Sequence, residues 1–100
     1  MIQKKDILQF IKKNNDYLKK HFHLKKIGLF GSFANDEQTE DSDIDIIIEF
    51  EENTNHLFEL KQELRDFIGN KFNKKVDIAN EKYLRASVKK EILEEVVYID

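Results

Sequence analysis

The sequence predicts an α/β (α+β) fold in which a small mixed β-sheet is flanked by helices. Short apolar runs typical of strands alternate with longer amphipathic stretches typical of helices along the whole chain. The chain also has no Pro and only three Gly, which is unusual for a sheet-rich sandwich with many tight turns. Because 100 residues with 40% apolar content can bury one core, we expect a single domain over residues 1–100.

The first elements follow from hydrophobic spacing. Residues 2–22 carry an apolar stripe at helical spacing with paired lysines on the opposite face, which predicts one helix. The segment "KKIGLF" (25–30) is short and apolar and predicts a buried strand. Residues 32–36 then predict a short helix or turn, and residues 37–42 predict a polar loop.

The second half of the chain continues this alternation. The segment "DIDIIIEF" (43–50) is β-branched and apolar and predicts the clearest strand. Thr54 or Asn55 is expected to cap a second helix that stops at Gly69–Asn70. The segment "KKVDIA" (74–79) predicts a short strand. A last helix is expected to start near Ser87 and to include Val96, because Val88, Ile92 and Val96 follow one another at helical spacing.

The charges are distributed unevenly. Residues 1–26 carry eight Lys and two Asp, whereas residues 35–52 carry nine acidic and no basic residues. The near-neutral total of −3 does not indicate direct nucleic-acid binding, because a basic surplus would normally show. No Cys, signal peptide or membrane-length apolar run is present, so we expect a cytoplasmic protein that does not engage a membrane.

Two acidic residues stand out because they open an apolar strand. Asp43 and Asp45 lie two residues apart, so in a strand both carboxylates point to the same face. An unpaired carboxylate beside buried residues is unfavourable unless a cation or hydrogen bonds offset it. Paired carboxylates suit hard divalent cations such as Mg²⁺, which often shares its coordination sphere with substrate phosphates.

A glycine–serine pair and a third acid complete the candidate site. Gly31 ends the first expected strand and lets the backbone approach a ligand closely, and Ser32 follows where a helix N-terminus would favour an anion. Phe33 comes next, and its ring either packs or reaches a nucleotide. In the third expected strand, Val76 and Ile78 would face one side of the sheet and Asp77 the other. Asp77 could accept a proton from an attacking hydroxyl, or it could be a solvated residue at a strand end.

These motifs resemble the DNA polymerase β superfamily of nucleotidyltransferases. The spacing of Gly31-Ser32 to Asp43-Ile44-Asp45 matches its pattern, and "GLFGSFA", "SDIDIIIEF", "VDIA" and "ILEEVVYI" look like the minimal nucleotidyltransferases. The resemblance covers roughly residues 24–99. It implies a polymerase-β-like fold with a small mixed sheet and flanking helices.

The resemblance also implies an activity and a partner. Its members transfer AMP from ATP to a hydroxyl with two Mg²⁺ ions, and toxin–antitoxin members modify a tyrosine of a HEPN-domain ribonuclease toxin. Carried over by position, Gly31 and Ser32 bind the triphosphate, and Asp43 and Asp45 bind metal. Asp77 becomes the third metal ligand or the catalytic base. The sequence does not fix the acceptor or the oligomeric state, and an oligomer is possible.

Two residues depart from the family pattern Gly-Ser-x-Ala-Arg-Gly. Asn35 removes a cation expected near the phosphates, and Asp36 adds negative charge and replaces a residue tolerant of positive φ. Two interpretations therefore stand side by side. The chain is either an active adenylyltransferase or a degenerate module that neutralises a HEPN partner by contact alone.

Two further hypotheses are disfavoured by the sequence. Asp41, Asp43 and Asp45 have the spacing of an EF-hand calcium loop, but Ile46 stands where that loop needs Gly. Transfer to a small molecule would require an acceptor-binding domain or a dimer cleft, for which 100 residues leave little room.

Overall fold

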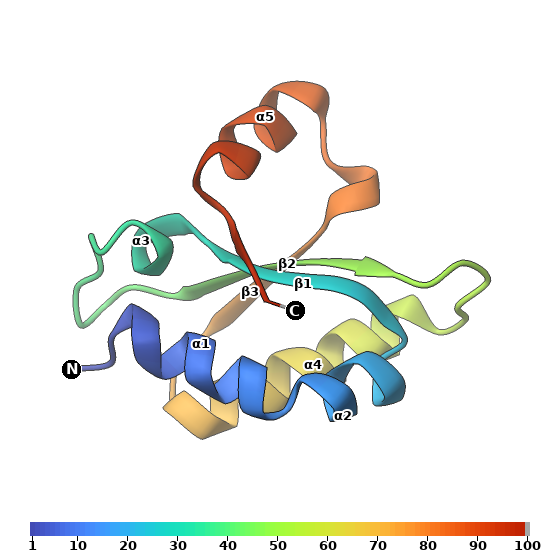
Figure 1. Cartoon of the computed structure of the whole chain (residues 1–100), viewed down its shortest axis with the longest axis horizontal. Coiled ribbons are helices and arrows are strands. Elements are labelled where there is room, and N and C mark those ends of the chain that lie inside the picture. Colours follow the sequence, from blue (N-terminus) through green and yellow to red (C-terminus); the bar gives the residue numbers. More distant parts are fainter. Residues whose placement is uncertain (100) are drawn as a thin grey trace.

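A computed structural model describes residues 1–99 of the chain, and helices lie on both faces of its β-sheet (Figure 1). One face is covered by α1 (Lys4–Lys13), α2 (Asn15–His21) and α4 (Leu57–Phe72), whereas α5 (Ala86–Glu95) lies over the other. A short helix, α3 (Gly31–Ala34), follows the first strand. The mixed sheet with flanking helices confirms the predicted fold class.

The sheet has four strands in the order β3-β2-β1-β4. Its central strands β1 (Leu24–Phe30) and β2 (Ile44–Phe50) are antiparallel. Strand β3 (Val76–Asn80) runs parallel to β2, and the short β4 (Val97–Tyr98) pairs antiparallel with β1. The strands predicted at 25–30, 43–50 and 74–79 therefore form, each with a boundary shift of one or two residues.

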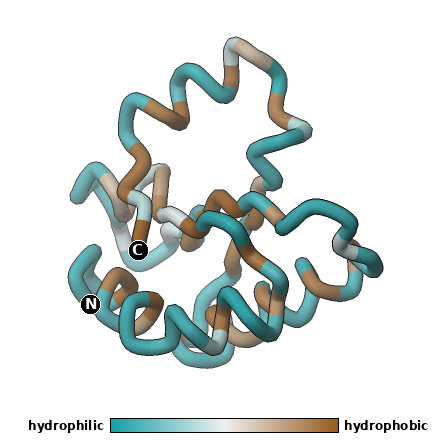
Figure 2. The backbone as a smooth tube through the Cα atoms, turned by 45° about the vertical axis from the view of Figure 1, so that its right-hand side comes forward, coloured by the Kyte–Doolittle hydropathy of each residue, from teal (hydrophilic) through white to brown (hydrophobic). Residues whose placement is uncertain are grey.

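The hydrophobic core lies between the sheet and the layer of α1, α2 and α4. Ile44, Ile46 and Ile48 alternate along β2 and are fully or almost fully buried, because every second residue of a strand faces the same side. Figure 2 shows hydrophobic residues along the central strands and hydrophilic residues over the outer turns of the helices. Asp45 and Glu49 alternate with the isoleucines and so point to the α5 side.

The predicted boundaries of the helices at 2–22 and at 54–70 were wrong. The second of these helices, α4, is preceded by His56 in the left-handed conformation rather than capped by Thr54 or Asn55. The single helix expected at 2–22 is divided into α1 and α2 at Asn14, whose side-chain Nδ2 and backbone N–H both donate to the Phe10 carbonyl, at 2.8 and 3.1 Å. A side-chain bond to the carbonyl four residues back is typical of positions where a helix bends. Helix α4 does not stop at Gly69 but runs to Phe72. It ends at Asn73, which adopts the left-handed conformation with φ 53°.

The third correction concerns the C-terminal segment. The last helix was expected to include Val96, but α5 ends at Glu95, and Val97 pairs with Leu29 of β1. Gly28 permits this pairing, because an added Cβ would lie 2.9 Å from the Val96 side chain. A short 3₁₀ helix, η1 (Glu81–Tyr83), leads from β3 into the arm that carries α5. Within residues 1–99, no helix is both long and apolar enough to cross a membrane.

Candidate functional site

The sheet places two of the three predicted acids next to each other. Asp45 of β2 and Asp77 of β3 are register partners in a parallel pair, so their backbones lie about 4.8 Å apart. Both lie on the α5 side of the sheet, and Asp77 is exposed to solvent whereas Asp45 is partly buried. The topology thus brings together residues that are far apart in the sequence.

Asp43 lies immediately before β2, at the end of the loop that follows α3. This loop is fastened to the start of β3, because Lys74 Nζ donates to the carbonyls of Glu40 at 2.7 Å and Ser42 at 3.0 Å. The Ile44 backbone N–H donates to the Lys75 carbonyl at 3.0 Å. These contacts hold the segment that carries Asp43 beside the strand that carries Asp77.

Gly31 lies against the Asp45 carboxylate. Its φ is +76°, in the left-handed region that favours glycine. An added Cβ would lie 2.1 Å from Asp45 Oδ2, so a side chain at position 31 would occupy the space of that carboxylate. Glycine is therefore required here both by the backbone conformation and by the acid that faces it.

The Asp45 carboxyl is electrostatically strained. Burial does most to raise its pKa from 3.8 to about 6. The negative charges of Asp77, Asp43 and Glu95 also raise this pKa, in that order. Within residues 1–99, no lysine or arginine forms an ion pair with Asp43, Asp45 or Asp77.

The carboxylates of Asp43, Asp45 and Asp77 suit a divalent cation, although they do not form a complete coordination sphere. Among the described residues, no three His, Cys, Asp or Glu side chains form a ready-made metal group. Adjacent carboxylate oxygens without a cationic partner are nevertheless the ligands that Mg²⁺ prefers, and Mg²⁺ takes its remaining ligands from water and phosphate. The acids could therefore hold Mg²⁺ together with a phosphate-bearing substrate.

Sequence reasoning missed a fourth acid at the site. Glu95, the last residue of α5, accepts a hydrogen bond from the Gly31 N–H at 3.1 Å and one from Asn35 Nδ2 at 2.6 Å. Nothing in its local sequence identifies Glu95, because its position depends on the pairing of β4 with β1. Asn35, noted only as a departure from the family pattern, is thus a partner of this acid.

The neighbouring residues of the α3 turn take different roles. Asp36 has φ 57°, so the turn does adopt the positive φ that a glycine would favour, and Asp tolerates it better than most residues. The Phe33 ring is fully buried in the core and packs there. Any contact of Phe33 with a nucleotide is therefore limited to its backbone. Ser32 is partly exposed at the start of the turn.

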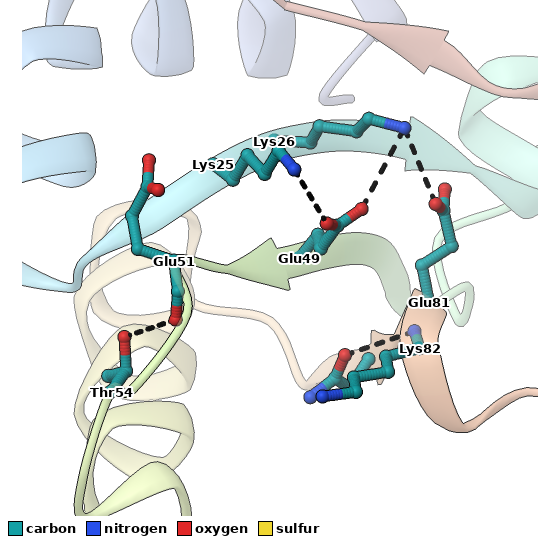
Figure 3. Close-up of polar contacts among 8 residues, drawn as sticks. Lys25, Lys26, Glu49, Glu51, Thr54, Glu81 and Lys82 are labelled. Carbon is teal, nitrogen blue, oxygen red and sulfur yellow. Dashed lines mark hydrogen bonds and ion pairs between the residues drawn. The ribbon is translucent and has the colours of Figure 1, made fainter.

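The arm that carries Glu95 is fixed at its base by a buried acid. Glu81 of η1 is 6% exposed and accepts a hydrogen bond from the Tyr98 hydroxyl. Figure 3 shows the Lys26 side chain between those of Glu81 and Glu49. Its Nζ lies 3.4 Å from Glu81 Oε2 and 3.8 Å from Glu49 Oε1. Burial alone would raise the pKa of Glu81, but the Tyr98 hydrogen bond and the Lys26 charge hold it below its ordinary value. This cluster joins the start of the arm to β1 and β4.

Comparison with known proteins gives a consistent assignment. Residues 10–99 match the nucleotidyltransferase domain family. The chain is 33% identical over 101 residues to the protein adenylyltransferase MntA of Thermococcus cleftensis, covering 99% of this chain and 98% of that protein.

Solved structures show the same fold. A structure provisionally described as a minimal nucleotidyltransferase superposes with a TM-score of 0.78 at 24% identity, covering 96% of this chain and 95% of that chain. An MNT antitoxin in complex with a tri-AMPylated HEPN toxin from Shewanella oneidensis gives a TM-score of 0.62 at 17% identity. That match covers 91% of this chain and 70% of the other.

Proposed function

The chain belongs to the nucleotidyltransferase domain family, and we propose that it transfers AMP from ATP to a hydroxyl group of a protein. The proposed acceptor is a tyrosine of a HEPN ribonuclease toxin, which would make the chain an antitoxin that acts by AMPylation. The name of the Thermococcus relative supports the reaction, and the AMPylated HEPN toxin in the Shewanella complex supports a HEPN toxin as the acceptor protein. The tyrosine is proposed from the family resemblance alone. Residues 1–100 would act as one catalytic domain.

One observation carries this proposal. Asp45 and Asp77 are register partners on one face of the sheet, and Asp45 lies against a glycine that has no room for a side chain. Acids that are held together without cationic partners destabilise a fold unless a ligand compensates them. A site that accepts this unfavourable arrangement is typical of catalysis rather than of structure.

We assign the residues to roles on this basis. The backbone N–H groups after Phe30 and the Ser32 hydroxyl would bind the triphosphate, and Asp43 and Asp45 would hold Mg²⁺. When bound, two Mg²⁺ ions would neutralise the charge that develops on the phosphate oxygens. Asp77, which is exposed, would be a third ligand or would take the proton of the acceptor hydroxyl.

The bond changes balance without an additional reactant. The acceptor oxygen forms a bond to the α-phosphorus, the bond from that phosphorus to the bridging oxygen breaks, and pyrophosphate leaves. The hydroxyl proton passes to Asp77 or to solvent. The acids and the Gly31 turn contribute by aligning the attacking and leaving oxygens.

The test is transfer of label from α-³²P-ATP to a purified HEPN partner in the presence of Mg²⁺. We expect labelling to fall by about 100-fold or more in Asp45→Asn, because a charge that stabilises the transition state is lost. Asp41→Asn, which removes an exposed acid close by in the sequence, is the matched control and should retain labelling. A Tyr→Phe change at the acceptor position of the partner should abolish it.

The alternative function has a distinct outcome. Tight complex formation that silences the partner without label transfer would show a binding module that acts by contact alone. This result would contradict the proposed reaction. Labelling of the partner by the Asp45→Asn variant at the wild-type rate would contradict the assigned site.

A further inference from the structure

The α3 turn already holds an anion that belongs to the chain itself. Both oxygens of the Glu95 carboxylate are engaged: Oε1 by the Gly31 N–H at 3.1 Å and Oε2 by Asn35 Nδ2 at 2.6 Å. Glu95 is separated from these residues by 64 and 60 positions in the sequence. A hydrogen bond that involves a charged group is stronger than one between neutral groups, so this contact is a significant one.

This carboxylate lies at the proposed phosphate site. Gly31 is in contact with the Asp45 carboxylate, and its N–H donates to the Glu95 carboxylate. A phosphate oxygen that approached the Gly31 N–H would meet the Glu95 oxygen at the same donor. Two anions cannot share one N–H at hydrogen-bond distance without strong repulsion.

The protein holds Glu95 in this position from both sides. On the C-terminal side, Val97 and Tyr98 pair with Leu29 and Gly28, and the Ile99 N–H donates to the Ile27 carbonyl at 2.9 Å. On the N-terminal side of the arm, Glu81 is bonded to the Tyr98 hydroxyl. These contacts fix the end of α5, so the Glu95 side chain is held beside the α3 turn.

We propose that Glu95 is an intramolecular competitor of the triphosphate, which must be displaced from the Gly31 N–H and the Asn35 amide before a nucleotide can bind. This inference rests on the proposed function, because it assumes that the same turn receives the phosphates. It makes Glu95 an autoinhibitory residue that sets nucleotide affinity and lies outside the group of acids assigned to metal. Displacement would move the Glu95 side chain, while the pairing of β4 with β1 would still hold the end of α5.

The first test uses an anion that cannot react. Calorimetric titration with sodium tripolyphosphate, without Mg²⁺, should give about tenfold tighter binding to Glu95→Gln than to the wild type, since the displaced contact loses its charge. Glu95→Ala should give a similar gain. Glu94→Gln removes the same charge from the adjacent, exposed residue and should leave the affinity within about twofold of the wild type. Equal or weaker binding by Glu95→Gln, or no binding by any of the four proteins, would overturn the proposal.

The second test does not depend on a variant. In ¹⁵N-labelled wild-type protein, tripolyphosphate should shift the NMR signals of the Gly31 amide, the Asn35 side-chain amide and the backbone of Glu95 and Val96 together. Movement of the Gly31 signal without any change at Glu95 and Val96 would overturn the proposal. Because tripolyphosphate carries no AMP, a failure of AMP transfer leaves both tests intact. Conversely, AMP transfer together with unchanged affinity in Glu95→Gln would refute only the competitor role.

Discussion

At the scale of single residues, the site is defined by Asp45 and the glycine that faces it. The Asp45 carboxyl has a pKa raised to about 6, chiefly by burial. The absence of a side chain at Gly31 makes room for this carboxylate, because an added Cβ would lie 2.1 Å from Asp45 Oδ2. The sequence spacing identified both residues, but it did not reveal that they touch.

Asp45→Asn should stabilise the protein in the absence of ligands. The carboxyl has a higher pKa in the folded state than its ordinary 3.8, so ionisation disfavours folding. This penalty is complete above about pH 6 and disappears as the pH falls towards 4. After allowance for partial exposure, the variant should gain about 1 kcal/mol at pH 8, or about 4–8 °C in Tm.

Thermal unfolding of Asp45→Asn, wild type and the control Asp41→Asn at pH 8 and pH 4 measures this effect. The gain should be specific to Asp45→Asn and should shrink at pH 4. A lower Tm for Asp45→Asn at pH 8, or a gain that does not depend on pH, would show that the carboxylate is not strained.

Gly31→Ala should destabilise the protein for two separable reasons. The positive φ costs a non-glycine residue about 1–2 kcal/mol, and the added Cβ forces the Asp45 carboxylate to move. In a double-mutant cycle with Asp45→Ala, only the second cost should vanish, giving a coupling of about 1 kcal/mol in the free energy of unfolding. Strict additivity, measured by denaturant titration of the four proteins, would mean that the two residues do not meet.

Among the secondary-structure elements, those that depend on the local sequence pattern were predicted correctly. The run "DIDIIIEF" predicted β2 because its residues are β-branched and apolar, which favours a strand, and Ile44, Ile46, Ile47 and Ile48 are indeed buried. The break at Asn14 and the end of α5 were not predicted. The first lies at Asn14, whose side chain also bonds the Phe10 carbonyl, and the second depends on a tertiary pairing between Val97 and Leu29.

The residues of the candidate site divide in the same way. Gly31, Asp43, Asp45 and Asp77 could be proposed from spacing, since they belong to strands or directly adjoin them. Glu95 could not, because it reaches the site only through the pairing of β4 with β1 across more than sixty positions. Spacing within a strand is thus readable in a sequence, whereas a contact across the sheet requires the topology.

The hydrogen bond between Tyr98 and Glu81, which joins β4 to η1, should stabilise the fold. Tyr98→Phe should leave the buried Glu81 carboxylate with Lys26 alone at 3.4 Å, at a cost of about 1–3 kcal/mol. Because the folded-state pKa of Glu81 is lowered, its contribution is present above its ordinary pKa of 4.5 and is lost as the pH falls through the lowered value. The stability difference between Tyr98→Phe and wild type should therefore narrow below pH 4.5.

The matched control is Tyr83→Phe, which removes a hydroxyl from a tyrosine that is 69% exposed on the same arm. It should change the free energy of unfolding by less than about 0.5 kcal/mol. An equal effect of the two substitutions, or a larger loss for Tyr83→Phe, would contradict the anchoring role of Tyr98.

In the molecule as a whole, the sheet separates the hydrophobic core from the candidate site. One face packs against α1, α2 and α4 and contains the core, whereas the α5 face carries Asp45, Asp77 and the Glu95 contact (Figure 1). The same face has a second acidic region further along β2. There Glu49, Glu51 and Glu52 line a cavity of about 470 Å³ together with Lys82 and Lys89. Glu49 is already paired with Lys25 and Lys26, so this second region offers a divalent cation a poorer site than Asp45 and Asp77 do.

The most direct measurement of the central claim is where a divalent cation binds in the presence of a nucleotide. Mn²⁺, used in place of Mg²⁺ with a non-hydrolysable ATP analogue, broadens the NMR signals of nearby residues. We expect broadening centred on residues 31–33, 43–45 and 77, no effect on the signals of residues 51–53, and loss of the broadening in Asp45→Asn. Broadening centred on residues 49–54, or an unchanged pattern in Asp45→Asn, would contradict the central claim.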